Sequence, residues 1–309
     1  MSTMSVIRRV SAGWLVMVCA IGVWAQEPQS RLVDELVPPD PWPVREEEVQ
    51  RRGEAVDPEE GGDLGRQVLL RRHPSARALR LSSTSDWFYH SNILLLEQGR
   101  LDDGVFQQTF EAAWSPRWDS AWLGTVYARY VLVRYHDHDE LDFDGNEVGV
   151  TLSHRLGYQA NVYGGLRGLR LYLEDGEDEF FKGLDLMVGI WRGHAWWERT
   201  WFFYGYQLDW RPTSPGSLHR VDNAGYVGLK FFPAAAWHVQ LLYRLRWEEY
   251  VEVSRSDLNH LLSISATWDP TEFFRLRVSG EYGANHSGAP NFDYSYLAGG
   301  GSVQLQIRF

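Results

Sequence analysis

Arginine side chains recur at alternate positions in several segments of the chain, and this spacing limits what they can bind. Arg244 and Arg246 are two residues apart in AWHVQLLYRLRWEEY, and Arg275 and Arg277 have the same spacing in FFRLRVSGEYG. In an extended strand, residues two apart lie on one face. A face of guanidinium groups attracts anions and forms planar pairs with carboxylates and phosphates. The candidate chemistry is therefore anion binding.

The polar faces of the expected strands carry more bases than acids, and these bases are the candidate binding residues. They are Arg129, Arg155, Arg167, Arg170, Arg199, Lys230, Arg244, Arg246, Arg275 and Arg277. The acids on the same faces are Asp86, Glu111, Asp185, Asp209, Glu248 and Glu281. The formal net charge of the whole chain is -11, so most of its acids lie elsewhere, in the polar segments described below. The alternative is that these bases and acids pair across neighbouring strands and fill the interior.

Catalytic chemistry is not expected from the spacing of histidine and serine. A serine nucleophile needs a base within hydrogen-bond reach. His90 is adjacent to Ser91, and Ser153 is adjacent to His154. Adjacent residues of a strand point to opposite faces, so neither histidine can reach its serine. The HPS segment at 73–75 has a suitable spacing and precedes the strands. The sequence therefore predicts no catalytic residues.

A metal site is not expected either, although one segment is dense in suitable ligands. The segment HDHDELDFDGNE covers residues 136–147, and Asp142 and Asp144 in it resemble the start of a calcium-binding loop. The glutamate that should close such a loop would fall at Thr151. We interpret the segment as a solvated surface loop, and we expect no metal and no cofactor.

The elements that must position the arginines are β-strands. From Trp237 to Trp247 every second residue is apolar, and the residues between them include Gln240, Arg244 and Arg246. A period of two is typical of a strand with two different faces. In ANVYGGLRGLRLYL the alternation slips, which predicts a β-bulge near Gly168.

Turn signals divide the chain into similar hairpins from about residue 78 onward. Short turns are indicated at a nearly constant spacing by Pro116, Gly157, Gly193, Pro233 and Pro270. Longer polar loops alternate with them. These loops are expected at 136–147, 174–180, 211–222, 253–257 and 286–294. A repeat of this kind predicts six hairpins and therefore twelve strands.

These features together predict an all-β protein, a twelve-stranded antiparallel transmembrane β-barrel. An even strand number, short turns at one end and long loops at the other are typical of such barrels. Trp and Tyr cluster near the strand ends, where membrane interfaces place them. No run of 18 apolar residues follows residue 30, so no transmembrane helix is expected. The Trp237 face should meet lipid, and the Arg244 face should meet a water-filled lumen.

The N-terminal part differs from the barrel region. Arg8 and Arg9 precede an apolar stretch at 10–25, which predicts a signal peptide over 1–25 that is cleaved near Ala25. Residues 26–77 are rich in Pro, Glu and Arg and poor in apolar residues. This composition predicts a disordered periplasmic linker. The barrel is then expected over 78–309.

The last strand carries a resemblance to a known class. The chain ends in GSVQLQIRF, with Phe309 as its final residue. This segment resembles the terminal strand of Gram-negative outer-membrane β-barrel proteins, which ends in an aromatic residue that the barrel-assembly machinery recognises. The resemblance implies a bacterial outer-membrane location, Phe309 as the assembly signal, and outer-membrane lipid and lipopolysaccharide as surroundings.

A barrel of twelve strands with a basic lumen also resembles the acidic-oligosaccharide porins. We therefore expect a passive, anion-preferring pore for small acidic solutes. The rival hypothesis is a closed structural or docking barrel, whose 26–77 segment or acidic loops bind a partner. An outer-membrane lipid-modifying enzyme is the least favoured hypothesis. Nucleic acid is not an expected partner, because the chain is strongly acidic.

Overall fold

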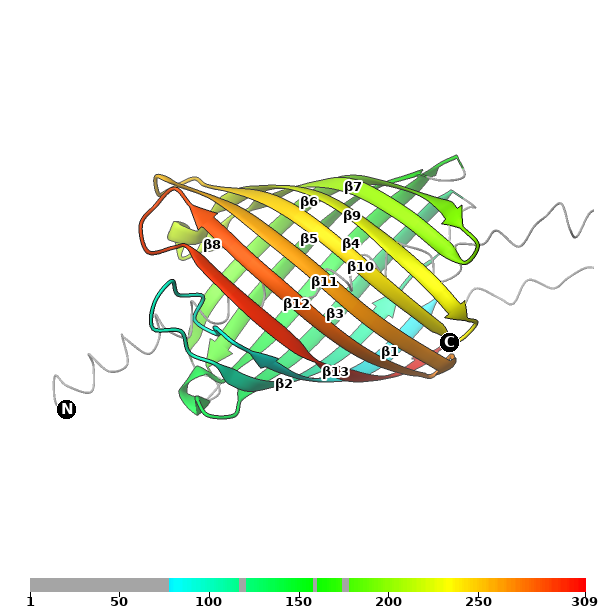
Figure 1. The fold of residues 1–309 in the computed structure, drawn as a ribbon, viewed down its shortest axis with the longest axis horizontal. Helices are drawn as coiled ribbons and strands as arrows, with labels where there is room; N and C mark the ends of the chain where they lie inside the picture. The colour runs from blue at the N-terminus through cyan, green and yellow to red at the C-terminus, as the bar shows by residue number, and fades with distance from the viewer. Residues whose placement is uncertain (1–77, 117–120, 158–159, 174–177) are drawn as a thin grey trace, which may run out of the picture.

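The protein is a closed antiparallel barrel of twelve long strands, as the sequence predicted (Figure 1). The computed structural model describes residues 78–116, 121–157, 160–173 and 178–309, so the predicted signal peptide and linker lie outside the described residues. The strands are β1 (Leu79–His90), β2 (Asp103–Trp114), β3 (Trp122–Tyr135), β4 (Phe143–Leu156), β5 (Ala160–Leu173), β6 (Glu179–Trp197), β7 (Thr200–Arg211), β9 (Arg220–Ala234), β10 (Trp237–Tyr250), β11 (Arg255–Thr271), β12 (Phe274–Ser287) and β13 (Tyr294–Arg308).

Closure occurs between the first and last strands, where β1 pairs with β13. A two-residue strand, β8 (Thr213–Ser214), lies beside β6, and two short 3-10 helices, η1 (Asp139–Leu141) and η2 (Gly216–Leu218), lie in the longer loops. We call the end with the C-terminus and the short turns the turn end, and the opposite end the loop end. None of the helices in the described part of the chain is long and apolar enough to cross a membrane.

The strands are tilted relative to the barrel axis. A row of residues paired across successive strands is therefore displaced along the axis, from one end of the barrel toward the other. One row starts with Arg80 at the turn end of β1 and passes through Arg167 and Asp185, which are paired on β5 and β6. The same direction leads to Arg220 and Tyr250, which are paired at the loop end of β9 and β10. Side chains that contact one another across successive strands therefore form a spiral.

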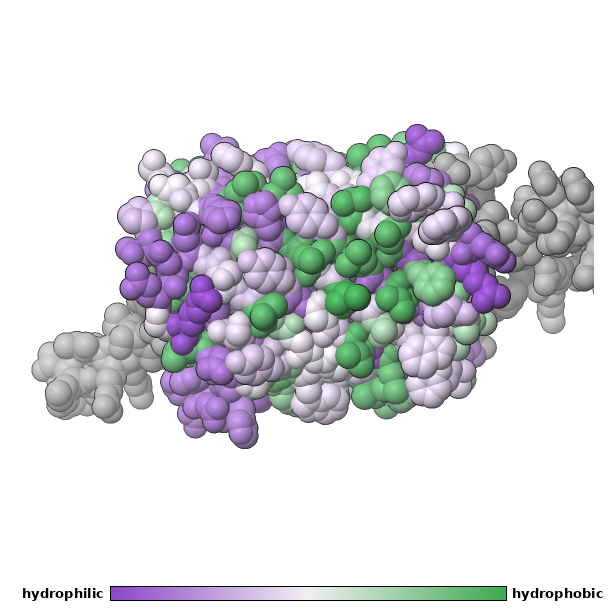
Figure 2. All heavy atoms as spheres, viewed as in Figure 1, coloured by the Kyte–Doolittle hydropathy of each residue, from purple (hydrophilic) through white to green (hydrophobic). Residues whose placement is uncertain are grey.

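The predicted alternation of faces is confirmed in β10. His238, Gln240, Arg244 and the other even-numbered residues of this strand are buried inside the barrel, and Trp237 is among the exposed odd-numbered ones. The outer surface shows apolar residues across the middle of the barrel and hydrophilic residues gathered at its ends (Figure 2). Such an outer band is what a lipid bilayer requires.

Large aromatic side chains inside the barrel lie over glycines of the next strand. A Cβ atom added at Gly149 would meet the ring of Tyr127 at 2.5 Å, and Cβ atoms at Gly189 and Gly283 would overlap the rings of Tyr163 and Tyr296. Glycine leaves the space that each ring occupies, so each ring lies close against the backbone of the neighbouring strand.

The positions of several turns and loops differ from the prediction. Gly193 lies within β6, and the chain reverses at 198–199 instead. Pro233 and Pro270 also lie within strands, just before the turns. The polar segments predicted as loops at 136–147, 211–222 and 253–257 are shorter, because β4, β9 and β11 begin inside them. Strands of a barrel continue past the apolar band, so polar composition alone does not end them.

Candidate functional site: the barrel lumen

A chain of ion pairs begins on the inner face of the first four strands. An Arg80 guanidinium nitrogen lies 2.7 Å from a Glu111 carboxylate oxygen, and Arg129 lies 2.8 Å from the other oxygen of Glu111. Arg129 also lies 3.4 Å from Glu147, whose side chain is fully buried. Each acid or base in the middle of this chain is shared by partners on both neighbouring strands.

The chain of ion pairs continues over β5 and β6 toward the loop end. Glu147 lies 4.0 Å from Arg167, and Arg167 is hydrogen-bonded to Asp185. Asp185 in turn lies 3.7 Å from Arg211, at the last residue of β7. The guanidinium of Arg211 also reaches Asp209, at 3.6 Å.

The last part crosses β9 and β10. Asp222 is fully buried and lies 3.2 Å from Arg211 and 3.0 Å from Arg220. Arg220 lies 3.2 Å from Glu248, which also pairs with Arg246. We call this connected set, from Arg80 on β1 to Arg246 on β10, the ion-pair spiral.

The ion-pair spiral changes the interpretation of the basic residues predicted to bind anions. Arg129, Arg167 and Arg246 do lie inside the barrel, but each is paired with a carboxylate of its own or a neighbouring strand. Buried charges need such partners, because burying an unpaired charge is very costly. The alternative in which bases and acids pair across strands therefore describes this part of the lumen.

The remaining inward-facing bases lie on one side of the lumen. Lys230 and Arg244 are each about 2% exposed, and Arg244 is hydrogen-bonded to Asn259 at 3.4 Å. Arg275 pairs with Asp269 at 2.6 Å, and Arg277 donates to the Thr267 hydroxyl at 3.3 Å. These bases share β9–β12 with a group of inward-facing small hydroxyl residues. The hydroxyl residues are Ser263, Ser265, Thr267 and Ser279. We call this surface the basic wall.

Arg244 of the basic wall and Gln240, which lies beside the wall on the same strand β10, have polar atoms without hydrogen-bond partners. Both side-chain polar atoms of Gln240 and the Nε and Nη1 atoms of Arg244 are buried and lack such a partner in the structure. Lys230 and Ser265 are the cross-strand partners of Gln240. Buried polar groups are normally hydrogen-bonded. The hydrogen-bonding capacity of these two side chains is therefore not fully used within the protein.

Three of the predicted lumen residues lie elsewhere. Arg170 is 65% exposed and lies on the outer face of β5, because pairing with β4 runs without a break through Gly168 and the predicted bulge there is absent. The irregularity of β5 is found at 171–172 instead. Arg199 is in the turn after β6 and donates to the Pro233 carbonyl. Arg155 belongs by alternation to the inner face of β4, but it lies next to the last residue of the strand and is exposed.

Several residues of the ion-pair spiral were not predicted. Arg211, Arg220 and Asp222 fell in a segment assigned to a loop, as did Glu147. The alternation of charged and apolar residues continues through Gln207, Asp209 and Arg211, and this was a usable signal that β7 is longer.

The opposite side of the lumen is apolar at the loop end. Val131, Val133 and Phe143 point inward there, and two residues of the β1–β2 loop, Ile93 and Leu94, are buried against them. This loop therefore folds into the mouth of the barrel. The β3–β4 side of the lumen is therefore apolar at its loop end, and the basic wall lies on β9–β12.

Asn92 holds the β1–β2 loop in this position. Its side chain is fully buried, donates to the Leu96 and Ser295 carbonyls at 2.8 and 3.2 Å, and accepts from the Leu96 amide at 3.0 Å. We expect Asn92→Ala to release the loop and to increase trypsin cleavage at Arg100 by about tenfold, since each buried hydrogen-bonding group left unpaired costs about 1–3 kcal/mol. Gln98→Ala, an exposed change in the same loop, should leave the cleavage rate unchanged.

The candidate catalytic and metal residues have other contacts. Nδ1 of His90 accepts a hydrogen bond from the Asn92 amide, whereas the Ser91 hydroxyl accepts one from the Leu297 amide. The Asp142 carboxylate accepts a hydrogen bond of 2.7 Å from the Tyr135 amide. Among the described residues, no group of three or more His, Cys, Asp or Glu could hold a metal ion.

The C-terminal segment has the expected alternation at its end. Leu305, Ile307 and Phe309 are more than half exposed on the outer face. Phe309 and Leu79 exchange backbone hydrogen bonds of 2.9 and 3.3 Å, so the final residue extends the seam with β1. Recognition of Phe309 by the assembly machinery stays a prediction.

Comparison with known proteins identifies the fold. Neither a protein-family model nor a curated protein sequence matches the chain. An outer-membrane channel from Pseudomonas putida F1 is similar in structure, with a TM-score of 0.55 at 7% identity over 82% of this chain and 100% of that chain. The barrel has the fold of a bacterial outer-membrane protein. Lower scores of 0.41 and 0.44 relate it to an anion-selective porin from Comamonas acidovorans (7% identity, 74% and 98% of the two chains) and to the NanC porin (11%, 74% and 100%).

Proposed function

We propose that the protein is an outer-membrane pore that prefers small acidic solutes. The turn end faces the periplasm in this proposal, and the loop end faces the exterior. The channel function named for the Pseudomonas putida protein supports a pore. The observation that carries the preference for anions is the basic wall, because its donors are not all paired within the protein.

The charge of the basic wall favours acidic solutes. On the inner faces of β9–β12, between the turn end and the level of Arg244, the described bases outnumber the described acids. The bases are Lys230, Arg244, Arg275 and Arg277, and the acids are Asp269 and Glu281. The charges of the ion-pair spiral compensate one another, so they do not cancel the excess of bases on this wall. Serine and threonine hydroxyls beside the bases suit solutes that carry both carboxylate and hydroxyl groups.

Arg244→Gln tests this proposal. Removing the guanidinium should lower the permeability ratio of chloride to potassium by about threefold, because it removes positive potential from a narrow lumen. The measurement is the reversal potential of the refolded mature protein in a planar bilayer under a salt gradient. Arg192→Gln, on the outer face of β6, is the matched control and should change nothing. Equal selectivity in both variants would contradict the placement of Arg244 beside the path.

The second candidate is a closed barrel that docks a partner. The apolar side of the lumen favours it, because Ile93 and Leu94 fill part of the mouth. A heat-modifiable protein that inserts in bilayers without conductance steps would support closure. Deletion of 26–77 would then test docking, since unchanged complex formation in pull-downs would exclude that segment as the binding surface.

A further inference from the structure

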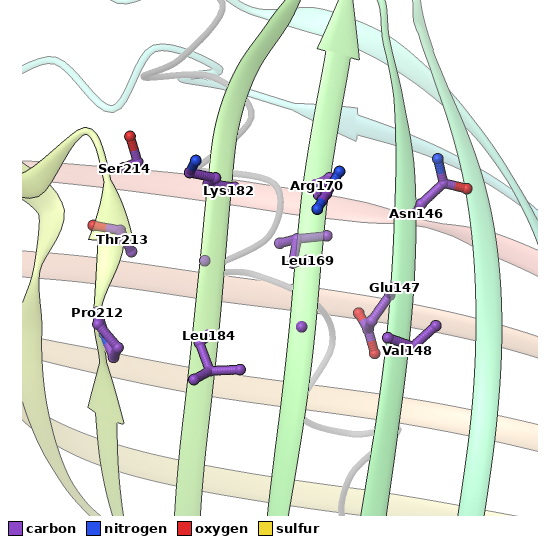
Figure 3. Close-up of a pocket in the computed structure, with 12 residues that line it drawn as sticks. Asn146, Glu147, Val148, Leu169, Arg170, Lys182, Leu184, Pro212, Thr213 and Ser214 are labelled. Atoms are coloured by element: carbon purple, nitrogen blue, oxygen red, sulfur yellow. The ribbon is translucent and has the colours of Figure 1, made fainter.

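A row of polar side chains crosses the outer face of the barrel near the loop end. Asn146 pairs with Arg170, Arg170 with Lys182, and Lys182 with Ser214, so all four are direct cross-strand neighbours on β4, β5, β6 and β8. Figure 3 shows them at one level across these strands. At the usual strand separation the row spans about 14 Å.

An apolar row lies directly beneath it, on the side of the barrel's middle. Val148 pairs with Gly168, Gly168 with Leu184, and the Leu184 amide donates to the Pro212 carbonyl. Gly168 has no side chain, so the wall is hollowed between Val148 and Leu184. The two rows line a shallow depression of about 680 Å³.

The charges of the polar row favour an anion. Arg170 is 65% exposed, and the carboxylate with which it pairs among the described residues is that of Glu179, at 3.7 Å and itself about one-third exposed. Such a pair is worth little in an exposed position. Lys182 is also exposed. A guanidinium and an ammonium on adjacent strands suit a phosphate group.

We propose that this depression binds an anionic lipid, with its phosphate on Arg170 and Lys182 and an acyl chain over Gly168. The polar row lies where the outer apolar band gives way to the loop end, which is the depth of lipid headgroups. The apolar row lies at the depth of the chains. Asn146 and Ser214 provide hydrogen bonds for the remaining headgroup atoms. This site requires the barrel to lie in a membrane, but it does not require the lumen to conduct.

The test is lipid retention by the refolded mature protein, measured by native mass spectrometry. Phosphatidylglycerol and phosphatidylcholine with identical acyl chains are the probes. The wild-type protein should retain phosphatidylglycerol preferentially, and R170Q with K182Q should lower its affinity about thirtyfold, as expected for two basic groups near a lipid surface. Retention of phosphatidylcholine should not change. R192Q removes an outward-facing base near the turn end of the same strand β6 and should behave as wild type.

Gly168→Leu tests the acyl-chain part separately. A Cβ at Gly168 would lie 3.8 Å from the nearest atom, a Val148 methyl, so a side chain can begin there without displacing the strands, and its remaining atoms would enter the depression. Filling the hollow should weaken phosphatidylglycerol binding although Arg170 and Lys182 remain. Heat-modifiable migration on gels verifies that each variant is folded.

Two outcomes would overturn the proposal. Equal phosphatidylglycerol retention by the wild type and the double variant would show that the polar row is not a headgroup site. Full competition by inorganic phosphate, together with no effect of Gly168→Leu, would identify a site for free phosphate instead of lipid. Conductance of the double variant should equal that of the wild type, because both residues lie outside the lumen, so failure of the pore proposal would be seen independently.

Discussion

Gly300→Ala is expected to prevent closure of the barrel. Gly300 lies on β13 opposite Phe88 of β1, at the seam where the last strand meets the first. An added Cβ would overlap the Trp87 carbonyl oxygen and would lie 2.6 Å from the Phe88 Cα. These are backbone atoms, so the two strands would have to separate. We expect a loss of at least about 3 kcal/mol in the free energy of unfolding, which is large for a single added methyl group.

The measurement is the fraction of refolded protein that migrates as the compact, heat-modifiable form, followed by urea unfolding of that form. Gly299→Ala is the matched control, because its Cβ would lie 3.5 Å from the nearest atom, the Ser279 carbonyl oxygen. The same added methyl should have little effect there. Equal folding yields and urea midpoints for the two variants would contradict the seam geometry.

Asp222→Asn should destabilise the barrel by about 3 kcal/mol, because breaking a buried ion pair leaves its partner uncompensated. Asp222 is fully buried and forms ion pairs with both Arg211 and Arg220. Loss of its charge leaves two guanidinium groups facing each other at the loop end, held only by their remaining acids. The variant should also increase the anion preference of the pore, since it removes one negative charge from the interior.

Urea unfolding in lipid vesicles, followed by tryptophan fluorescence, measures the effect on stability. Glu249→Gln removes an exposed acid near the loop end of β10 and is the control. We expect its urea midpoint to equal that of the wild type. If Asp222→Asn also unfolded at the wild-type midpoint, the ion-pair spiral would contribute nothing to stability.

The fold could be predicted because the alternation of apolar and polar residues along each strand identifies its two faces. The residues from Trp237 to Tyr250 are sufficient to assign the inner and outer faces of β10, and the structure confirms them. Strand ends were harder to predict. Arg211 and Arg220 flank a segment rich in Pro, Ser and Gly, and composition there does not distinguish a loop from the protruding end of a strand.

The pairing of the lumen charges could not be predicted from one strand at a time. Glu111 and Arg129 are 18 residues apart, and only the register between β2 and β3 makes them neighbours. The error at Arg170 had the same origin. A bulge near Gly168 was inferred from a slip in the alternation of apolar and polar residues, whereas the partner strand β4 continues its pairing through that position.

The ion-pair spiral also bears on how the strands find their correct partners. A slip of one residue between two strands would turn apolar side chains into the lumen, and the alternation of faces penalises it. A slip of two residues keeps every side chain on its proper face, so the lipid-facing pattern does not detect it. Such a slip would move Glu111 away from Arg129 and Asp185 away from Arg167. The ion-pair spiral thus favours the native register over two-residue slips, which the alternation of apolar and polar faces does not disfavour.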